Sequence, residues 1–148
     1  MSTQNNKILI IGLVWPEPEA TAAGMRMMQL IHFFLRQDYE LYFASAATKS
    51  ELSYDFKELP VTCIEIELNS SSFDKKLINL DPSIVIYDRF LTEEQYGWRV
   101  RQTCPEALRI LDTEDLHFLR KSREMALKEG TDNWMKFVQN DTAKREIA

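Results

Sequence analysis

Residues 7–14 read KILIIGLV, a short and almost continuous apolar run that is rich in β-branched side chains. Such a run is typical of a strand that is buried on both faces in the middle of a parallel sheet. We therefore expect these residues to form the first and central strand of the fold.

The rest of the chain alternates between strand and helix patterns around this run. Further strands are expected at residues 40–45 (ELYFAS), 61–68, 83–87 (SIVIY) and 107–111 (ALRIL). Apolar residues at helical spacing predict helices at residues 22–36, 49–59, 92–104, 116–128 and 131–148, with one more that follows the serines at 70–72 and ends at Leu80.

Strands that alternate with helices imply right-handed crossovers and a parallel sheet with helices on both faces. We expect an α/β fold, a Rossmann-like three-layer sandwich with a mainly parallel sheet of order 3-2-1-4-5, as a single domain over residues 1–148. Ligands of such sheets bind beyond the carboxyl ends of the strands near the switch point. The loops after the first, fourth and fifth strands are therefore the expected places for a functional site.

Composition limits the class of protein. A chain of 148 residues can bury one core, and 18 basic against 23 acidic residues give a charge of -5, which argues against a nucleic-acid partner. Cys63 and Cys104 have no metal-ligand spacing, so neither a metal site nor a disulfide framework is expected. The sequence has no signal-peptide pattern and no apolar run long enough to span a membrane, so we expect a cytoplasmic protein. A peripheral contact with a membrane surface is compatible with this expectation.

The first loop, residues 15–26, reads WPEPEATAAGMR and leads into a helix. A helix N-terminus attracts anions, and Gly24 would let a phosphate approach the backbone. Arg26 would pair with that phosphate, or with Glu17 or Glu19 instead. The loop has no dinucleotide or P-loop glycine pattern, so no such cofactor is expected, and Gly24 has the alternative role of relieving crowding against the sheet.

Asp88 and Arg89 directly follow the apolar run SIVIY. A charged pair at the carboxyl end of a buried strand is where α/β proteins place functional groups, and both residues are candidate substrate-binding groups. The alternative is a local salt bridge that orders the loop.

Three carboxylates and a histidine follow the fifth strand, where the sequence reads DTEDLH from residue 112. Neighbouring carboxylates can shift one another's pKa and supply a base or orient a substrate hydroxyl. The alternative is a helix start, with Asp112 or Thr113 as N-cap and acids in the first turn. The candidate catalytic residues are Asp112, Asp115 and His117, with Glu114 as a substrate-binding residue.

Arg120 and Arg123 follow on the same expected helix, three residues apart. That spacing puts both on one face, which would meet an anionic ligand or form an ordinary solvated basic face.

Together, KILIIG, WPEPEATAAGMRMMQL, ELYFAS, SIVIYDRF and RILDTEDLHFLRKSR resemble the N-terminal domain of a GT-B glycosyltransferase of the family-4-like group. The resemblance covers nearly all of the chain. It implies two Rossmann-like domains that face a cleft, with the donor nucleotide held mainly by the C-terminal one, and retention of anomeric configuration without an essential metal ion or other cofactor.

The resemblance also implies roles for particular residues. Gly24 matches the loop glycine whose backbone comes near the donor diphosphate, and Arg26 is a phosphate partner by position. Related enzymes often carry a histidine near the transferred sugar after the fifth strand. This chain has Asp112 to Asp115 at that place, and His117 is slightly displaced.

The expected function is therefore that of an acceptor-binding domain, or fragment, of a glycosyltransferase that moves a sugar from a nucleotide-sugar donor to a glycan or other hydroxyl acceptor. A C-terminal donor domain does not fit in 148 residues. We expect the chain alone to be inactive, and to self-associate through a sheet edge or apolar face. The alternatives are a stand-alone, non-catalytic Rossmann-like binding module and part of a GT-B-like sugar-nucleotide epimerase.

Overall fold

The computed structural model describes residues 4–113 and 117–130. It divides into two compact units, Met1–Asp112 and Thr113–Ala148, and each is described by itself. The helix expected at residues 131–148 lies outside the described residues.

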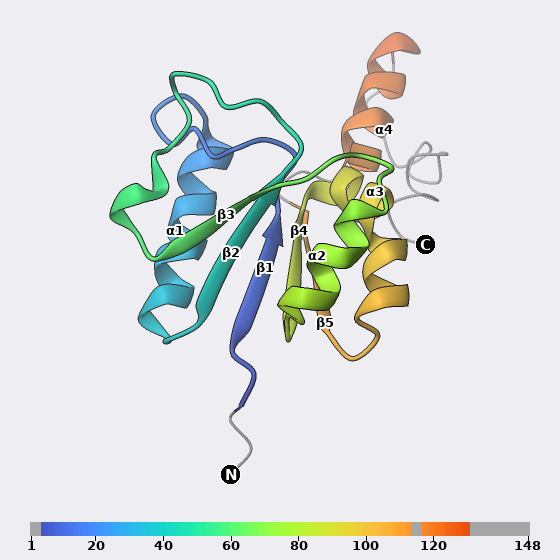
Figure 1. The fold of residues 1–148 in the computed structure, drawn as a ribbon. Helices are drawn as coiled ribbons and strands as arrows, with labels where there is room; N and C mark the ends of the chain where they lie inside the picture. The colour runs from blue at the N-terminus through green and yellow to red at the C-terminus, as the bar shows by residue number, and fades with distance from the viewer. Residues whose placement is uncertain (1–3, 114–116, 131–148) are drawn as a thin grey trace. The chain divides into compact units, whose positions relative to one another are not determined.

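The first unit is built on five parallel strands (Figure 1). They are β1 (Lys7–Ile11), β2 (Glu40–Ser45), β3 (Val61–Glu65), β4 (Ile84–Asp88) and β5 (Leu108–Asp112). All pairs are parallel, and the order is β3-β2-β1-β4-β5. The predicted α/β class, the Rossmann-like architecture and the strand order are confirmed.

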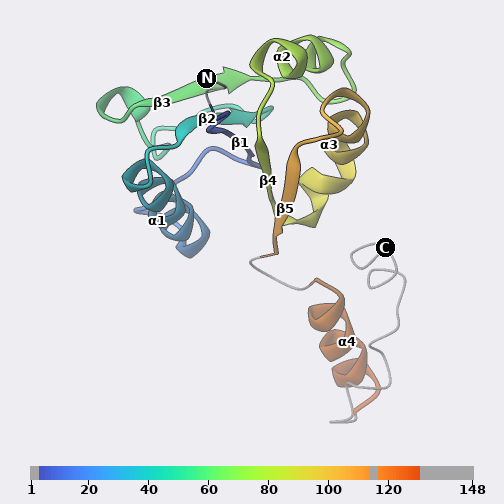
Figure 2. The ribbon, with the colours of Figure 1, turned by 90° about the horizontal axis from the view of Figure 1, so that it is seen from below.

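Helices cover both faces of this sheet. Figure 2 shows α1 (Ala22–Arg36) on one face, and α2 (Ser72–Leu80) and α3 (Arg89–Thr103) on the other. The side chains of β1 alternate between two cores, because successive residues of a strand point to opposite faces. Ile8 and Ile10 belong to the core under α1, whereas Leu9 and Ile11 belong to the core under α2 and α3.

The prediction of a helix at residues 49–59 is wrong. Only a three-residue 3-10 helix, η1 (Phe56–Glu58), forms there. The Ser53 hydroxyl accepts a hydrogen bond from Ser50 N at 2.9 Å, and the Ser50 hydroxyl accepts one from Leu52 N at 3.1 Å. Such local side-chain bonds compete with a helix, and Tyr54 N donates instead to the carbonyl of Pro16.

Helix α3 begins at Arg89, directly after β4, instead of at Thr92 as expected. The reason is the side chain of Thr92, which donates hydrogen bonds to the Asp88 carbonyl at 2.8 Å and the Arg89 carbonyl at 2.9 Å. Thr92 is buried and thus closes the first turn from inside the helix.

The second unit contains α4 (His117–Lys128), which agrees with the helix expected at residues 116–128. Within the described parts of the two units, none of the helices has the length and apolar character that a membrane crossing requires.

Candidate functional site at the carboxyl edge of the sheet

An ion pair joins the first helix to the last strand of the sheet. Nη2 of Arg26 lies 2.8 Å from Oδ1 of Asp112. Asp112 ends β5 and its side chain is only 8% exposed, whereas the side chain of Arg26 is 54% exposed. Arg26 therefore pairs across the sheet edge with Asp112 through a charge-assisted hydrogen bond.

Asp88 lies beside Asp112 at the same edge. The two residues are partners in the parallel register of β4 and β5, so their side chains leave the sheet on the same face. Both residues are buried, with exposures of 5% and 9%. Nε of Arg89 lies 3.8 Å from Oδ1 of Asp88. The site thus combines two buried carboxylates with two guanidinium groups.

Neither carboxylate serves as a helix cap. Asp88 occupies the N-cap position of α3, but its side chain makes no capping hydrogen bond within that described first turn. Asp112 is the last residue of β5 and Thr113 after it is not helical, so the alternative of Asp112 as an N-cap is wrong.

The backbone at Arg89 is unusual. Its φ is +74°, in the left-handed region that residues with a side chain rarely adopt and that costs about 1–3 kcal/mol. This conformation lets the chain turn from β4 into α3 without a connecting loop. As a result, Asp88 and Arg89 lie at the direct junction of β4 and α3.

Gly24 is needed for packing of the first loop. A Cβ at this position would lie 2.6 Å from the carbonyl carbon and oxygen of Glu17, so the crowding comes from the loop and not from the sheet. The N–H of Gly24 donates to the hydroxyl of Thr21, the N-cap of α1, at 2.9 Å. The backbone group that we expected to meet a phosphate therefore already has a partner.

Space at the switch point between β1 and β4 is small. A cavity of about 20 Å³ is lined by Trp15, Gly24, Asp88 and Arg89 among others. That volume accommodates about one water molecule. The buried charges are thus packed against the first loop.

The other expected site residues belong to the second unit. His117, Arg120 and Arg123 are on α4, and Arg123 is exposed. Glu114 and Asp115 lie outside the described residues. Their proposed roles stay predictions.

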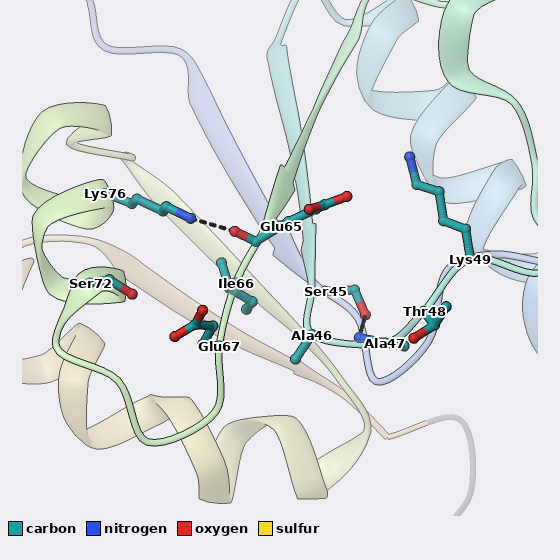
Figure 3. A pocket seen from close by; sticks show the side chains of 10 residues that line it. All are labelled: Ser45, Ala46, Ala47, Thr48, Lys49, Glu65, Ile66, Glu67, Ser72 and Lys76. Carbon is teal, nitrogen blue, oxygen red and sulfur yellow. Dashed lines mark hydrogen bonds between the residues drawn. The ribbon is translucent and has the colours of Figure 1, made fainter.

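A second cavity lies beyond β2 and β3, where we did not expect a site (Figure 3). Its volume is about 700 Å³, and it is lined by Ser45, Ala46, Ala47, Thr48, Lys49, Glu65, Ile66, Glu67, Ser72 and Lys76. The sequence predicts a site in the loops after the first, fourth and fifth strands, near the switch point. The available signal in the sequence was the polar side chains at the ends of the two expected strands, Ser45 in 40–45 and Glu65 and Glu67 in 61–68.

Burial shifts the pKa of several groups in the first unit. Burial, followed by the charge of Glu93, raises the pKa of Tyr87, and its hydroxyl has no hydrogen-bond partner among the described residues. Burial also raises the pKa of the Cys63 and Cys104 thiols, so neither is an activated nucleophile. Cys104 is buried, Cys63 is half-buried, and both are free.

Within residues 4–113 and 117–130, no group of three or more histidine, cysteine and acidic residues could hold a metal ion. The chain significantly matches no protein-family model, no curated protein and no solved structure.

Proposed function

We propose that the chain is the acceptor-binding domain of a glycosyltransferase, which transfers a sugar from a nucleotide-sugar donor to a hydroxyl acceptor. The observation that carries the proposal is the buried pair Asp88 and Asp112 at the carboxyl ends of neighbouring parallel strands. Carboxylates at this edge are well suited to orient an acceptor hydroxyl, because they accept its hydrogen bond and hold its oxygen in place. The resemblance to GT-B glycosyltransferases is the reason that we propose transfer of a sugar from a nucleotide-sugar donor to the acceptor.

Asp112 has one oxygen in use and one that is not. Oδ1 accepts from Arg26, whereas Oδ2 is buried and has no hydrogen-bond partner among the described residues. A buried acceptor without a partner costs about 1–3 kcal/mol, and more when it is charged. A substrate hydroxyl that reached Oδ2 would remove this cost, so we propose that this oxygen, once it is uncovered, holds the acceptor.

Arg26 has a second role in the proposal. Its side chain is half exposed, so a phosphate can approach it from solvent. A guanidinium beside the departing diphosphate would stabilise the charge that develops as the sugar leaves. The donor itself would be held mainly by a partner domain, while Asp115 and His117 remain further candidates for the polar group near the transferred sugar.

A non-catalytic binding module is the second candidate. The observation that favours it is the cavity of about 20 Å³ at the switch point, which has room for about one water and none for a nucleotide. In this alternative the Arg26–Asp112 pair only ties α1 to β5.

Sugar-transfer assays distinguish the two candidates. The protein isolated from its own cells, and the purified 148-residue chain, are each given a panel of radiolabelled nucleotide sugars and hydroxyl acceptors. We expect transfer by the former and none by the latter, whose folding is checked by circular dichroism. Full turnover by the purified chain would contradict the proposal that a partner domain holds the donor. No transfer by the native protein would favour the binding module.

A further inference from the structure

The cavity beyond β2 and β3 has the size and place of a ligand site. Its volume of about 700 Å³ falls within the range of small-molecule pockets. It lies at the carboxyl ends of two parallel strands, which is the edge of the sheet where α/β proteins place ligands, and beside the first residue of α2, although away from the switch point between β1 and β4. β1 separates β2 and β3 from β4 and β5, so this cavity is distinct from the Asp88 and Asp112 site and does not depend on its function.

The charges that line this cavity cancel. Lys49 and Lys76 stand against Glu65 and Glu67, and three hydroxyl residues, Ser45, Thr48 and Ser72, are interspersed among them. An anion would meet two carboxylates, and a cation would meet two ammonium groups. The lining therefore favours an uncharged ligand that both donates and accepts hydrogen bonds.

Both ammonium groups already have partners inside the protein. Nζ of Lys49 lies 4.5 Å from the centroid of the Trp15 ring, a cation–π contact. Nζ of Lys76 donates a hydrogen bond to the backbone carbonyl of Glu65. Figure 3 shows Lys76 pointing toward Glu65 and Lys49 extending away from Ala46, so the two amines do not converge as they would around a phosphate.

Ser45 supplies a buried hydrogen-bond donor at the base of the cavity. The residue is 1% exposed, and its Oγ accepts from the N–H of Ala47 at 3.2 Å. Among the described residues this is its only side-chain hydrogen bond, so the hydroxyl proton is left to donate. A buried donor is stabilised by an acceptor atom, and a ligand oxygen in the cavity would provide it.

We infer that this cavity binds a neutral, polyhydroxylated ligand of the saccharide type. Sugar hydroxyls accept from Ser45 and Lys76 and donate to Glu67, which matches a lining of mixed donors and acceptors without net charge.

Titration of the ¹⁵N-labelled full chain tests the inference, with maltotriose as the neutral probe and inorganic phosphate as the anionic one. Maltotriose is expected to shift the amides of residues 45–49, 65–67 and 72–76, and phosphate to leave them unchanged. Shifts from phosphate alone, or no shift with millimolar maltotriose, would overturn it. Maltotriose shifts confined to Arg26, Asp88 and Asp112 would also overturn it, and would instead favour the proposed acceptor site.

Variants with matched controls locate the binding. Glu67→Gln and Lys76→Gln should each weaken maltotriose binding about tenfold, since each loses a charged hydrogen-bond partner. Glu58→Gln and Lys75→Gln change the same residue types outside the lining and should leave the affinity unchanged. Equal affinity in the cavity variants and their controls contradicts the assignment. Glu67 is exposed, so its variant is expected to fold.

Discussion

Arg26 and Asp112 are 86 residues apart in the sequence, yet Nη2 of the first lies 2.8 Å from Oδ1 of the second. The pair connects the N-terminal part of α1 with the end of β5 at the carboxyl edge of the sheet. Its partners differ in environment, since Asp112 is buried and Arg26 is half exposed.

A double-mutant cycle on Arg26→Ala and Asp112→Ala should give a coupling energy of about 1 kcal/mol. The value exceeds that of a surface pair because the carboxylate is buried, and stays below that of a buried pair because solvent screens the guanidinium. Urea unfolding measures each variant. The control is Arg101–Glu93, an exposed pair at 3.3 Å, for which about 0–0.5 kcal/mol is expected. Equal coupling in both cycles would contradict the account.

Gly24→Ala should lower the free energy of unfolding by about 1–3 kcal/mol, because its Cβ would lie 2.6 Å from the Glu17 backbone. Gly97→Ala provides the contrast. Its Cβ would meet the flexible side chain of Glu93 at 2.6 Å, which can move away, and alanine favours the interior of α3. We expect Gly97→Ala to be neutral or stabilising by up to about 1 kcal/mol. Thermal unfolding in the opposite rank order would show that the loop yields more easily than the helix.

Thr21→Ala should cost about 1 kcal/mol of stability, since its hydroxyl caps α1 by accepting from Gly24 N. Ser71 occupies the same position before α2 but makes no capping hydrogen bond through its side chain within that described helix start. Ser71→Ala is therefore expected to be near neutral. Similar losses in denaturant unfolding of the two variants would argue against the difference between the caps.

Tyr87→Phe should stabilise the protein by up to about 1 kcal/mol at pH 7, because it removes a buried hydroxyl without a partner among the described residues. Burial raises the folded-state pKa of Tyr87 above its usual value of 10.0. The free energy of unfolding of the wild type is therefore unaffected by ionisation of this group below pH 10, and falls as the pH rises further because the unfolded chain releases the proton first. The variant should lose less stability than the wild type between pH 9 and pH 11. Urea midpoints across this range measure the difference, and parallel losses would contradict the burial of the hydroxyl.

The sheet could be predicted from the sequence because each strand carries a local pattern. The runs at 7–14 and 83–87 are apolar on both faces, as the two central strands require. The prediction of a helix at residues 49–59 was wrong because serine side chains and the hydrogen bond from Tyr54 N to the Pro16 carbonyl determine the backbone there. The bond to Pro16 is a tertiary contact, which a local sequence pattern does not reveal.

The site could be placed only in part. Its position after the fourth and fifth strands follows from the order of the sheet, and both Asp88 and Asp112 were candidates. Their side-by-side arrangement depends on the register of β4 and β5, and the Arg26–Asp112 pair depends on how α1 crosses the sheet. Neither relationship leaves a local signal in the sequence. The cavity beyond β2 and β3 was missed because it forms from three segments that are separate in the chain.

Transfer by the Asp112→Asn variant of the native protein tests the central claim most directly. Asparagine preserves the shape of the side chain and its contact distance to Arg26, but removes the carboxylate that would hold the acceptor hydroxyl. With the best nucleotide-sugar and acceptor pair, kcat/KM should fall at least about a hundredfold, as expected for a positioning group, while the melting temperature changes by a few degrees at most. Unchanged kcat/KM in a folded Asp112→Asn protein would contradict the account.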